Sequence, residues 1–185
     1  MAGLLCPRLT LVSGPAASGK SRWAEHLAHS SGSAVVVMAT GPNLPNDASW
    51  QRRLERHRLR RPPSWRTLEV GGDLTAALLQ RTTDELALVD SLGTWVAAHL
   101  DRESPHWQDL VSALLETLQH QQAPIVLVSE ETGWGVVPST AVGGRFRDRL
   151  GELQQQLVPI CDAAWLVLQG RAIDLCKLGQ PVPHP

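Results

Sequence analysis

Short apolar runs alternate along the chain with segments in which apolar residues recur at helical spacing. This alternation predicts βαβ units, because buried parallel strands are continuously apolar and the helices between them are amphipathic. The predicted strands cover residues 9–13, 34–39, 86–90, 125–129 and 164–168, with a sixth, less apolar candidate at 65–70. The predicted helices cover residues 20–29, 48–60, 74–80, 107–121 and 145–157.

These elements predict an α/β fold built on an open, mostly parallel sheet with helices on both faces. No internal repeat and no domain linker interrupts the pattern, so residues 1–177 are expected to form a single domain. Residues 178–185 carry three prolines and are expected to be an extended or poorly ordered tail.

Composition agrees with a globular protein and excludes several other classes. The chain has 185 residues, of which 43% are hydrophobic and 19% charged, and its net charge of -1 gives no general attraction to nucleic acid or membrane. No apolar run is long enough to span a bilayer, and residues 1–10 lack the order of a signal peptide, so a cytoplasmic protein is expected. Three widely spaced cysteines, Cys6, Cys161 and Cys176, indicate reduced thiols rather than disulfides or a zinc site.

Residues 14–21 match the phosphate-loop pattern G-x-x-x-x-G-K-[ST] in full, between a predicted strand and a predicted helix. The two glycines let the backbone curl so that its N–H groups face phosphate oxygens, and the helix N-terminus adds positive charge. Lys20 is expected to reach the β- and γ-phosphates, and the Ser21 hydroxyl to bind Mg²⁺. A glycine turn that happens to precede a lysine would not explain the flanking elements. The pattern therefore predicts a P-loop NTPase-like fold that binds a nucleoside triphosphate through Gly14, Pro15, Ala16, Ala17, Ser18, Gly19, Lys20 and Ser21.

A phosphate loop that uses a metal also needs an acidic residue at a neighbouring strand end. Asp90 closes the predicted strand at residues 86–90 and is therefore the candidate metal ligand. The alternatives are a solvated carboxylate at the strand end or the N-cap of the next helix. Glu130 and Glu131 follow another buried strand, where they either face the nucleotide or belong to a turn.

Six arginines crowd into residues 52–61, with His57 in the middle and Glu55 as the one acid among them. On a helix, Trp50, Leu54 and His57 share one face, so the histidine is expected on a semi-apolar side with arginines around it. Three interpretations remain open on these residues alone. The segment could be a solvated basic helix, a nucleic-acid patch, or a polyphosphate site in which arginines bind phosphate and keep the imidazole neutral for attack on phosphorus.

Several motifs follow one another in a fixed order. Gly-Lys-Ser-Arg-x-Ala-Glu stands at residues 19–25 and a strand ending in Ala-Thr at 39–40. His-x-x-x-Arg-Pro stands at 57–62, Trp-Arg-Thr-x-Glu at 65–69 and Glu-x-Gly-x-Gly-x-Val-Pro at 131–138, while 144–151 closely approach Arg-x-Phe-Arg-Asp-x-x-Gly. In this order they resemble the bifunctional adenosylcobinamide kinase/adenosylcobinamide-phosphate guanylyltransferase family of cobalamin biosynthesis, over residues 9–177.

The resemblance implies two reactions in one chain. ATP or GTP phosphorylates the aminopropanol hydroxyl of adenosylcobinamide, and a histidine then attacks GTP to give a GMP–histidine phosphoramidate and pyrophosphate. The GMP passes to adenosylcobinamide phosphate. The resemblance implies that His57 is this histidine, with Lys20 as a second catalytic residue and Mg²⁺ as the metal ion. It also implies a homo-oligomer, a trimer by analogy, with no nucleic-acid partner and no membrane span.

The family's nucleotide contacts, carried onto this chain, fall in the phosphate loop and in four further places. These are Thr40, Gly41 and Pro42; Arg58, Leu59, Arg60 and Arg61; Glu69; and Asp90.

The chain departs from the family pattern at three points. Arg56 stands where relatives often have a first histidine before the nucleophile, Asp90 stands where a glutamate is expected, and Gln154-Gln155 replace Asn-Gln. Each departure bears on rate or nucleotide preference and leaves the core chemistry in place. Outside the family's nucleotide contacts, Arg145, Arg147 and Asp148 are expected either to form an i,i+3 ion pair or to contact substrate phosphate. Trp134, in the later glycine loop, is a candidate contact for the corrinoid.

Overall fold

The computed structural model describes residues 7–135 and 138–183. Its strands are β1 (Leu9–Gly14), β2 (Ala34–Ala39), β3 (Arg66–Glu69), β4 (Glu85–Asp90), β5 (Ile125–Glu130), β6 (Ala163–Leu168) and β7 (Arg171–Asp174). Its helices are α1 (Lys20–Ser30), α2 (Ala48–Arg60), α3 (Leu74–Gln80), α4 (Leu92–Ala98), α5 (Ser104–His120), α6 (Ala141–Leu157), the short 3-10 helix η1 (Val158–Ile160) and α7 (Leu175–Leu178). Within the described ranges no helix is long and apolar enough to cross a lipid bilayer.

All seven strands form one sheet in the order β3-β2-β4-β5-β1-β6-β7. Every neighbouring pair is parallel except β6 and β7, which are antiparallel. The expected α/β fold with an open, mostly parallel sheet is therefore confirmed.

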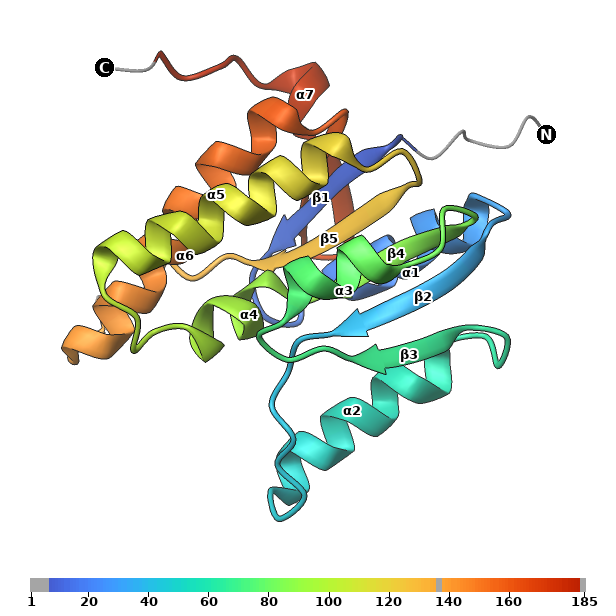
Figure 1. The fold of residues 1–185 in the computed structure, drawn as a ribbon, viewed down its shortest axis with the longest axis horizontal. Helices are drawn as coiled ribbons and strands as arrows, with labels where there is room; N and C mark the ends of the chain where they lie inside the picture. The colour runs from blue at the N-terminus through green and yellow to red at the C-terminus, as the bar shows by residue number, and fades with distance from the viewer. Residues whose placement is uncertain (1–6, 136–137, 184–185) are drawn as a thin grey trace.

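Helices cover both faces of the sheet (Figure 1), and a hydrophobic layer packs against each face. Alternate residues of β2 separate them: Val36 and Met38 pack with α3 to α6, whereas Val35 and Val37 pack with α1. Side chains of successive strand residues point to opposite faces, so a strand buried on both sides must be apolar throughout. This is why the central strands read as unbroken apolar runs. The helix α2 lies apart from both layers, beyond the β3 edge (Figure 1), and has no buried residue.

The predicted strands agree with the structure to within one residue at each end, the candidate at 65–70 included. The predicted bounds of α2 and α3 are correct, but two helix starts were placed too late. α5 begins three residues earlier, at Ser104, because Pro105 fits the first turn of a helix. α6 begins at Ala141, where the Thr140 side chain accepts a hydrogen bond from the Gly143 N–H.

The part of the chain that the structure describes contains four elements that the pattern did not predict: α4, η1, β7 and α7. All are short, and β7 is an edge strand of mixed polarity. The tail was predicted to begin at residue 178, but Leu178 ends α7, and residues 179–183 have no regular structure. Three short stretches lie outside the described residues: 1–6, which include Cys6, 136–137 in the glycine loop, and 184–185 in the tail.

The strand register brings the carboxyl ends of β1 to β5 together along one side of the sheet. Ala39 is level with Glu69 on one side and Asp90 on the other, and Gly14 is level with Glu130. Ligands of open parallel sheets bind at the carboxyl ends of the strands. The fold therefore gathers the phosphate loop, Asp90 and Glu130 on the side where a ligand is expected.

Candidate functional site

The phosphate loop leaves β1 at Gly14 and enters α1 at Lys20. Gly14 has no room for a side chain, because a Cβ there would lie 2.4 Å from the Val167 carbonyl oxygen and 2.7 Å from Ser18 Oγ. Gly19 has a φ of 101°, a left-handed conformation that favours glycine, and it precedes the first residue of α1. The two motif glycines thus let the backbone make a turn that most residues would obstruct.

Lys20 lies buried at the start of α1, where its Nζ donates a hydrogen bond to the Pro15 carbonyl at 3.3 Å. Burial lowers the pKa of Lys20 below its ordinary value, and the negative charge of Glu130 offsets this only in part. A phosphate group beside Nζ would restore the favourable charge environment that burial removes. Ser21 makes no side-chain hydrogen bond to any residue described, so its hydroxyl is free to bind a ligand.

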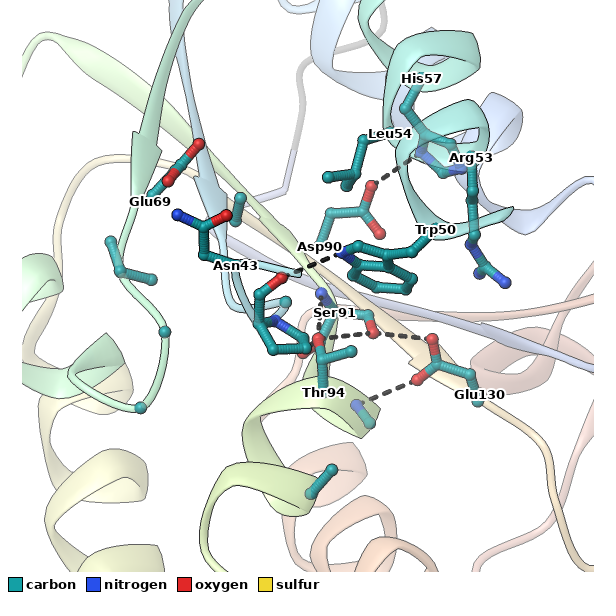
Figure 2. A pocket seen from close by; sticks show the side chains of 18 of the residues that line it. Asn43, Trp50, Arg53, Leu54, His57, Glu69, Asp90, Ser91, Thr94 and Glu130 are labelled. Atoms are coloured by element: carbon teal, nitrogen blue, oxygen red, sulfur yellow. Dashed lines mark hydrogen bonds and ion pairs between the residues drawn. The ribbon is translucent and has the colours of Figure 1, made fainter. Parts of the chain in front are cut away.

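Next to the loop, over the ends of β2, β3, β4 and β5, lies a cavity of about 680 Å³ (Figure 2). One wall comes from α2 and the segment before it, and the opposite wall from the start of α4 and from Phe146 of α6. Its lining residues are Ala39, Gly41, Pro42, Asn43, Trp50, Gln51, Arg53, Leu54, His57, Arg61, Glu69, Val70, Gly71, Gly72, Asp73, Asp90, Ser91, Gly93, Thr94, Ala97, Glu130 and Phe146.

His57 and Asp90, which both line this cavity, point toward one another (Figure 2). Nδ1 of His57 lies 3.1 Å from Oδ2 of Asp90, and the same oxygen accepts a 2.7 Å hydrogen bond from the Arg61 guanidinium. Each of the three side chains is less than one-fifth exposed. Asp90 therefore joins the histidine of α2 to Arg61, the residue that directly follows this helix.

The charge state of Asp90 fixes how the imidazole is oriented. Burial raises the pKa of this carboxyl, but the hydrogen bond from His57 and the positive charges of His57 and Arg61 outweigh it and hold the pKa below its ordinary value. An ionised carboxylate has no proton to donate, so Nδ1 of His57 must carry the hydrogen of the shared bond. In the neutral ring the lone pair then lies on Nε2, which is the nitrogen left free to act as a nucleophile.

A hydrogen-bonded group of polar residues forms the cavity floor. Glu130 accepts hydrogen bonds from the Ser91 hydroxyl at 2.7 Å and from the Gly93 N–H at 3.0 Å. Thr40 Oγ1 accepts from the Ser91 N–H at 2.9 Å and lies 2.6 Å from Thr94 Oγ1. These bonds tie the ends of β2, β4 and β5 to the first turn of α4, which gives the floor a fixed shape.

The structure brings only some of the predicted site residues to the cavity. Gly41, Pro42, His57, Arg61, Glu69 and Asp90 line it, and Thr40 belongs to its hydrogen-bonded floor. Residues 14–21 lie beside it without lining it, next to Glu130. Arg58 and Leu59 are exposed, Leu59 to 76%, and Arg60 pairs with Glu25 of α1.

Sequence reasoning missed several lining residues. Trp50, Leu54 and His57 were predicted to share a face of α2, and all three line the cavity, but Trp50 was given no role. Its indole Nε1 donates to the Pro42 carbonyl at 2.9 Å, and a Cβ on Gly41 would lie 2.7 Å from its ring. Glu130 was left between two interpretations, and Ser91 and Thr94 have no motif around them. Only the sheet register, which the sequence does not state, could have brought them together.

Four candidate residues, Trp134, Arg145, Arg147 and Asp148, do not line the cavity. An i,i+3 ion pair was one option for Arg145 and Asp148, but Asp148 pairs with its neighbour Arg147 at 2.9 Å, and Arg145 donates to the Leu100 carbonyl instead. Trp134 is 60% exposed, so it has free surface to offer a ligand.

Oxygen ligands for Mg²⁺ are available on both sides of the loop. Among the residues described, no group of three or more His, Cys, Asp or Glu side chains could hold a metal by itself. Mg²⁺ in phosphate-loop sites takes few protein ligands and keeps phosphate and water oxygens. The free hydroxyl of Ser21 fits this requirement. Asp90 fits it through Oδ1, since only Oδ2 takes part in the hydrogen bonds to His57 and Arg61.

Comparison with known proteins gives consistent results over most of the chain. The family described as "Cobinamide kinase / cobinamide phosphate guanyltransferase" matches residues 10–175. The bifunctional adenosylcobalamin biosynthesis protein CobP of Pseudomonas aeruginosa is 39% identical over 174 residues, covering 93% of this chain and 98% of that protein. The bifunctional adenosylcobalamin biosynthesis protein CobU of Escherichia coli is 32% identical over 182 residues, covering 90% and 99%.

Solved structures with a similar fold are far more distant in sequence. The flagellar accessory protein FlaH from Methanocaldococcus jannaschii has a TM-score of 0.53 at 13% identity, covering 95% of this chain and 83% of that one. A protein from Pyrococcus horikoshii OT3 has a TM-score of 0.55 at 8% identity, covering 92% and 86%. At such identities the likeness concerns the fold alone.

Proposed function

Because this chain belongs to the cobinamide kinase/cobinamide phosphate guanyltransferase family, we propose that its two reactions share the phosphate loop and differ in the use of His57. The enzyme phosphorylates adenosylcobinamide and then transfers GMP from GTP to the phosphorylated product. The observation that carries the proposal is the pairing of His57 with Asp90 at the same sheet edge as the loop.

In the kinase step, the loop N–H groups and Lys20 hold the triphosphate of ATP or GTP. The hydroxyl oxygen of the corrinoid attacks the γ-phosphorus and its proton passes to solvent water, while the bond from the γ-phosphorus to the bridging oxygen breaks and ADP or GDP leaves. Lys20 stabilises the charge that develops on the phosphate oxygens, and it does so strongly because it is buried.

In the transfer step, Nε2 of His57 attacks the α-phosphorus of GTP. A P–N bond forms, the bond between the α-phosphorus and the bridging oxygen breaks, and pyrophosphate leaves. A phosphate oxygen of adenosylcobinamide phosphate then attacks the same phosphorus and the P–N bond breaks, which gives adenosylcobinamide-GDP and free His57. Asp90 accepts a hydrogen bond from Nδ1–H throughout and stabilises positive charge on the ring.

The remaining assignments belong to the same proposal. Ser21 and Asp90 would hold Mg²⁺, which supplies positive charge to the phosphates when bound. The nucleotide contacts are the loop residues, Thr40 to Pro42, Arg58 to Arg61, Glu69 and Asp90. Of these, Arg58 and Leu59 are exposed and do not line the cavity, so their contacts to nucleotide rest on the family analogy alone. The family analogy further suggests a homotrimer, which light scattering of the purified protein would test.

Product analysis tests the function. The protein is incubated with adenosylcobinamide, Mg²⁺ and GTP, and products are separated by chromatography. The proposal requires adenosylcobinamide phosphate first, then adenosylcobinamide-GDP with one pyrophosphate released for each. His57→Asn is expected to stop after the first product. A plain kinase with a structural His57 would give the phosphate alone from both proteins, and a protein that binds RNA in a salt-dependent manner but gives neither product would contradict an enzymatic role.

A further inference from the structure

The helix that follows the phosphate loop carries a carboxylate with no role in the steps above. Glu25 lies four residues after Ser21 on α1, and its side chain is 12% exposed. Its two oxygens accept hydrogen bonds from Arg60, Oε2 from Nε at 3.1 Å and Oε1 from a terminal nitrogen at 3.0 Å. This two-point pairing fixes direction as well as distance between the groups.

Glu25 also reaches the next arginine along the chain. Nε of Arg61 lies 3.4 Å from Oε1 of Glu25, an ion-pair distance, while another nitrogen of the same guanidinium donates to Asp90 at 2.7 Å. Asp90 in turn holds Nδ1 of His57. A continuous series of charged contacts therefore leads from α1 through Arg61 and Asp90 to His57.

Few other contacts hold α2 in place. No residue of this helix is buried. The hydrogen bonds made by Trp50 and Gln51 go to Pro42 and Leu44, in the segment that leads into the helix. Among the described residues, the side-chain hydrogen bonds from α2 to other helices or strands are those of Arg60 with Glu25 and His57 with Asp90. The end of α2 that carries His57 is thus fixed by charge pairs and not by apolar packing.

We propose that Glu25 is a positioning residue for the GMP-transfer step, which fixes the His57 end of α2 to the helix that begins at the phosphate loop. The inference rests on the proposed role of His57. The loop holds the triphosphate at the start of α1, so a contact from α1 to α2 sets the distance between the α-phosphorus and the attacking nitrogen. Misplacement of a reacting group by about 1 Å can slow a reaction on the order of 100-fold.

The kinase step supplies the internal comparison, because it uses the loop but not His57. Glu25→Gln keeps the shape and helix propensity of the residue and removes its charge. We expect the single-turnover rate of GMP transfer from α-labelled GTP to the protein to fall on the order of tenfold or more. The rate of γ-phosphate transfer from ATP to adenosylcobinamide should stay within about twofold of wild type, since no group in contact with ATP has changed.

Three further variants make the result specific. Glu55→Gln removes a carboxylate from the exposed side of α2, where it forms no ion pair with any residue described, and should match wild type in both steps. Glu25→Asp keeps the charge on a shorter side chain, so its rate of GMP transfer should lie between those of wild type and Glu25→Gln. In the double variant Glu25→Gln/Arg60→Gln, the rate of GMP transfer should fall by less than the product of the two single fold-losses. The reason is that both substitutions remove the same contact.

Each outcome decides the question. Glu25→Gln that forms the GMP adduct at the wild-type rate overturns the inference, and so does an equal loss of both reactions with a lower melting temperature, which would mean a structural role. If wild type itself forms no adduct, the proposed role of His57 fails, and the inference that depends on it fails with it.

Discussion

At the scale of single residues, Asp90 decides which nitrogen of His57 can react. Its carboxylate accepts from Nδ1 and from Arg61, and these positive partners keep its pKa below the ordinary value of 3.8. The carboxylate therefore stays ionised at and below neutral pH, down toward that value, and remains an acceptor for Nδ1–H. The orientation of the nucleophile does not depend on pH near neutrality.

Replacing Asp90 by asparagine tests this role. The amide nitrogen of Asp90→Asn can donate to Nδ1, which favours the tautomer with hydrogen on Nε2 and removes the nucleophilic lone pair. We expect the rate of enzyme–GMP formation to fall on the order of 100-fold or more, by analogy with carboxylates that orient histidines elsewhere. Rapid-quench measurement with α-labelled GTP checks it, with the exposed Asp101→Asn as control. A wild-type rate in Asp90→Asn would contradict the assignment.

Gly14 gives a second prediction at this scale. A Cβ at this position would meet the Val167 carbonyl and Ser18 Oγ at less than 3 Å, so Gly14→Ala must displace the phosphate loop. Both reactions should be lost together, with nucleotide affinity reduced at least tenfold. Gly151→Ala is the matched control, because a Cβ there meets nothing within 4 Å inside α6. Titration calorimetry with a nonhydrolysable GTP analogue checks the affinities, and tight binding by Gly14→Ala would contradict the loop geometry.

At the scale of elements, α2 differs from the other long helices because it is held by charge and by its cap. Asp47 accepts hydrogen bonds from the N–H groups of Ser49 and Trp50 at the start of the helix. Loss of this cap frees the first turn, but the core loses nothing because α2 has no buried residue. Loss of the cap should therefore lower the local stability of α2 and leave the global stability of the protein unchanged.

Hydrogen exchange of Asp47→Ala measures this separation. Amides of α2 should exchange roughly fivefold faster than in wild type, since an N-cap contributes on this order to helix stability. Amides of β4 and β5 should be unaffected. Equal acceleration in α2 and the central strands would mean that α2 unfolds only with the whole molecule, contrary to the account.

The sequence could predict most elements because their patterns are local. The apolar runs of β2 and β5 and the amphipathic α3 need no knowledge of the rest of the chain. α4 carries Gly93, a poor helix former, in its first turn, and β7 pairs at the edge without an apolar pattern. In the candidate site, the loop and His57 were recognisable from motifs. The hydrogen bonds of Glu130 to Ser91 and Gly93 join residues 37 to 39 positions apart, which only the sheet register brings together.

At the scale of the whole molecule, ion pairs hold the β3 edge of the sheet as well as α2. Arg66 of β3 donates to Glu85 of β4 at 2.7 Å, reaching across β2, which lies between them. These hydrogen bonds from Arg66, together with one from Thr82, lower the pKa of Glu85 to about 2 despite the opposing effect of burial. The pair links β3 to β4 over β2 at the end of the sheet opposite the cavity.

Stability as a function of pH tests this link. Because the pKa of Glu85 is lowered on folding, its contribution is complete above its ordinary value of 4.5 and is lost as the pH falls toward about 2. Glu85→Gln should therefore be less stable than wild type in urea at pH 7, and the difference should shrink as the pH falls from 4.5. The effect is expected to be modest, because the Arg66 side chain is 45% exposed. A difference in unfolding free energy between Glu85→Gln and wild type that is constant from pH 7 to pH 3 would contradict the role of this ion pair. Glu116→Gln, exposed on α5, serves as control.

The proposed GMP transfer depends on one covalent bond between His57 and the α-phosphate of GTP. Protein is incubated with Mg²⁺ and GTP labelled at the α-phosphate, without corrinoid, and is then denatured and analysed for bound label. Wild type should retain label that is stable in alkali and released by acid, as expected of a phosphoramidate, while GTP labelled at the γ-phosphate should leave none. His57→Asn should retain no label from either nucleotide. Acid-labile α-label on His57→Asn, or none on wild type, would contradict the account.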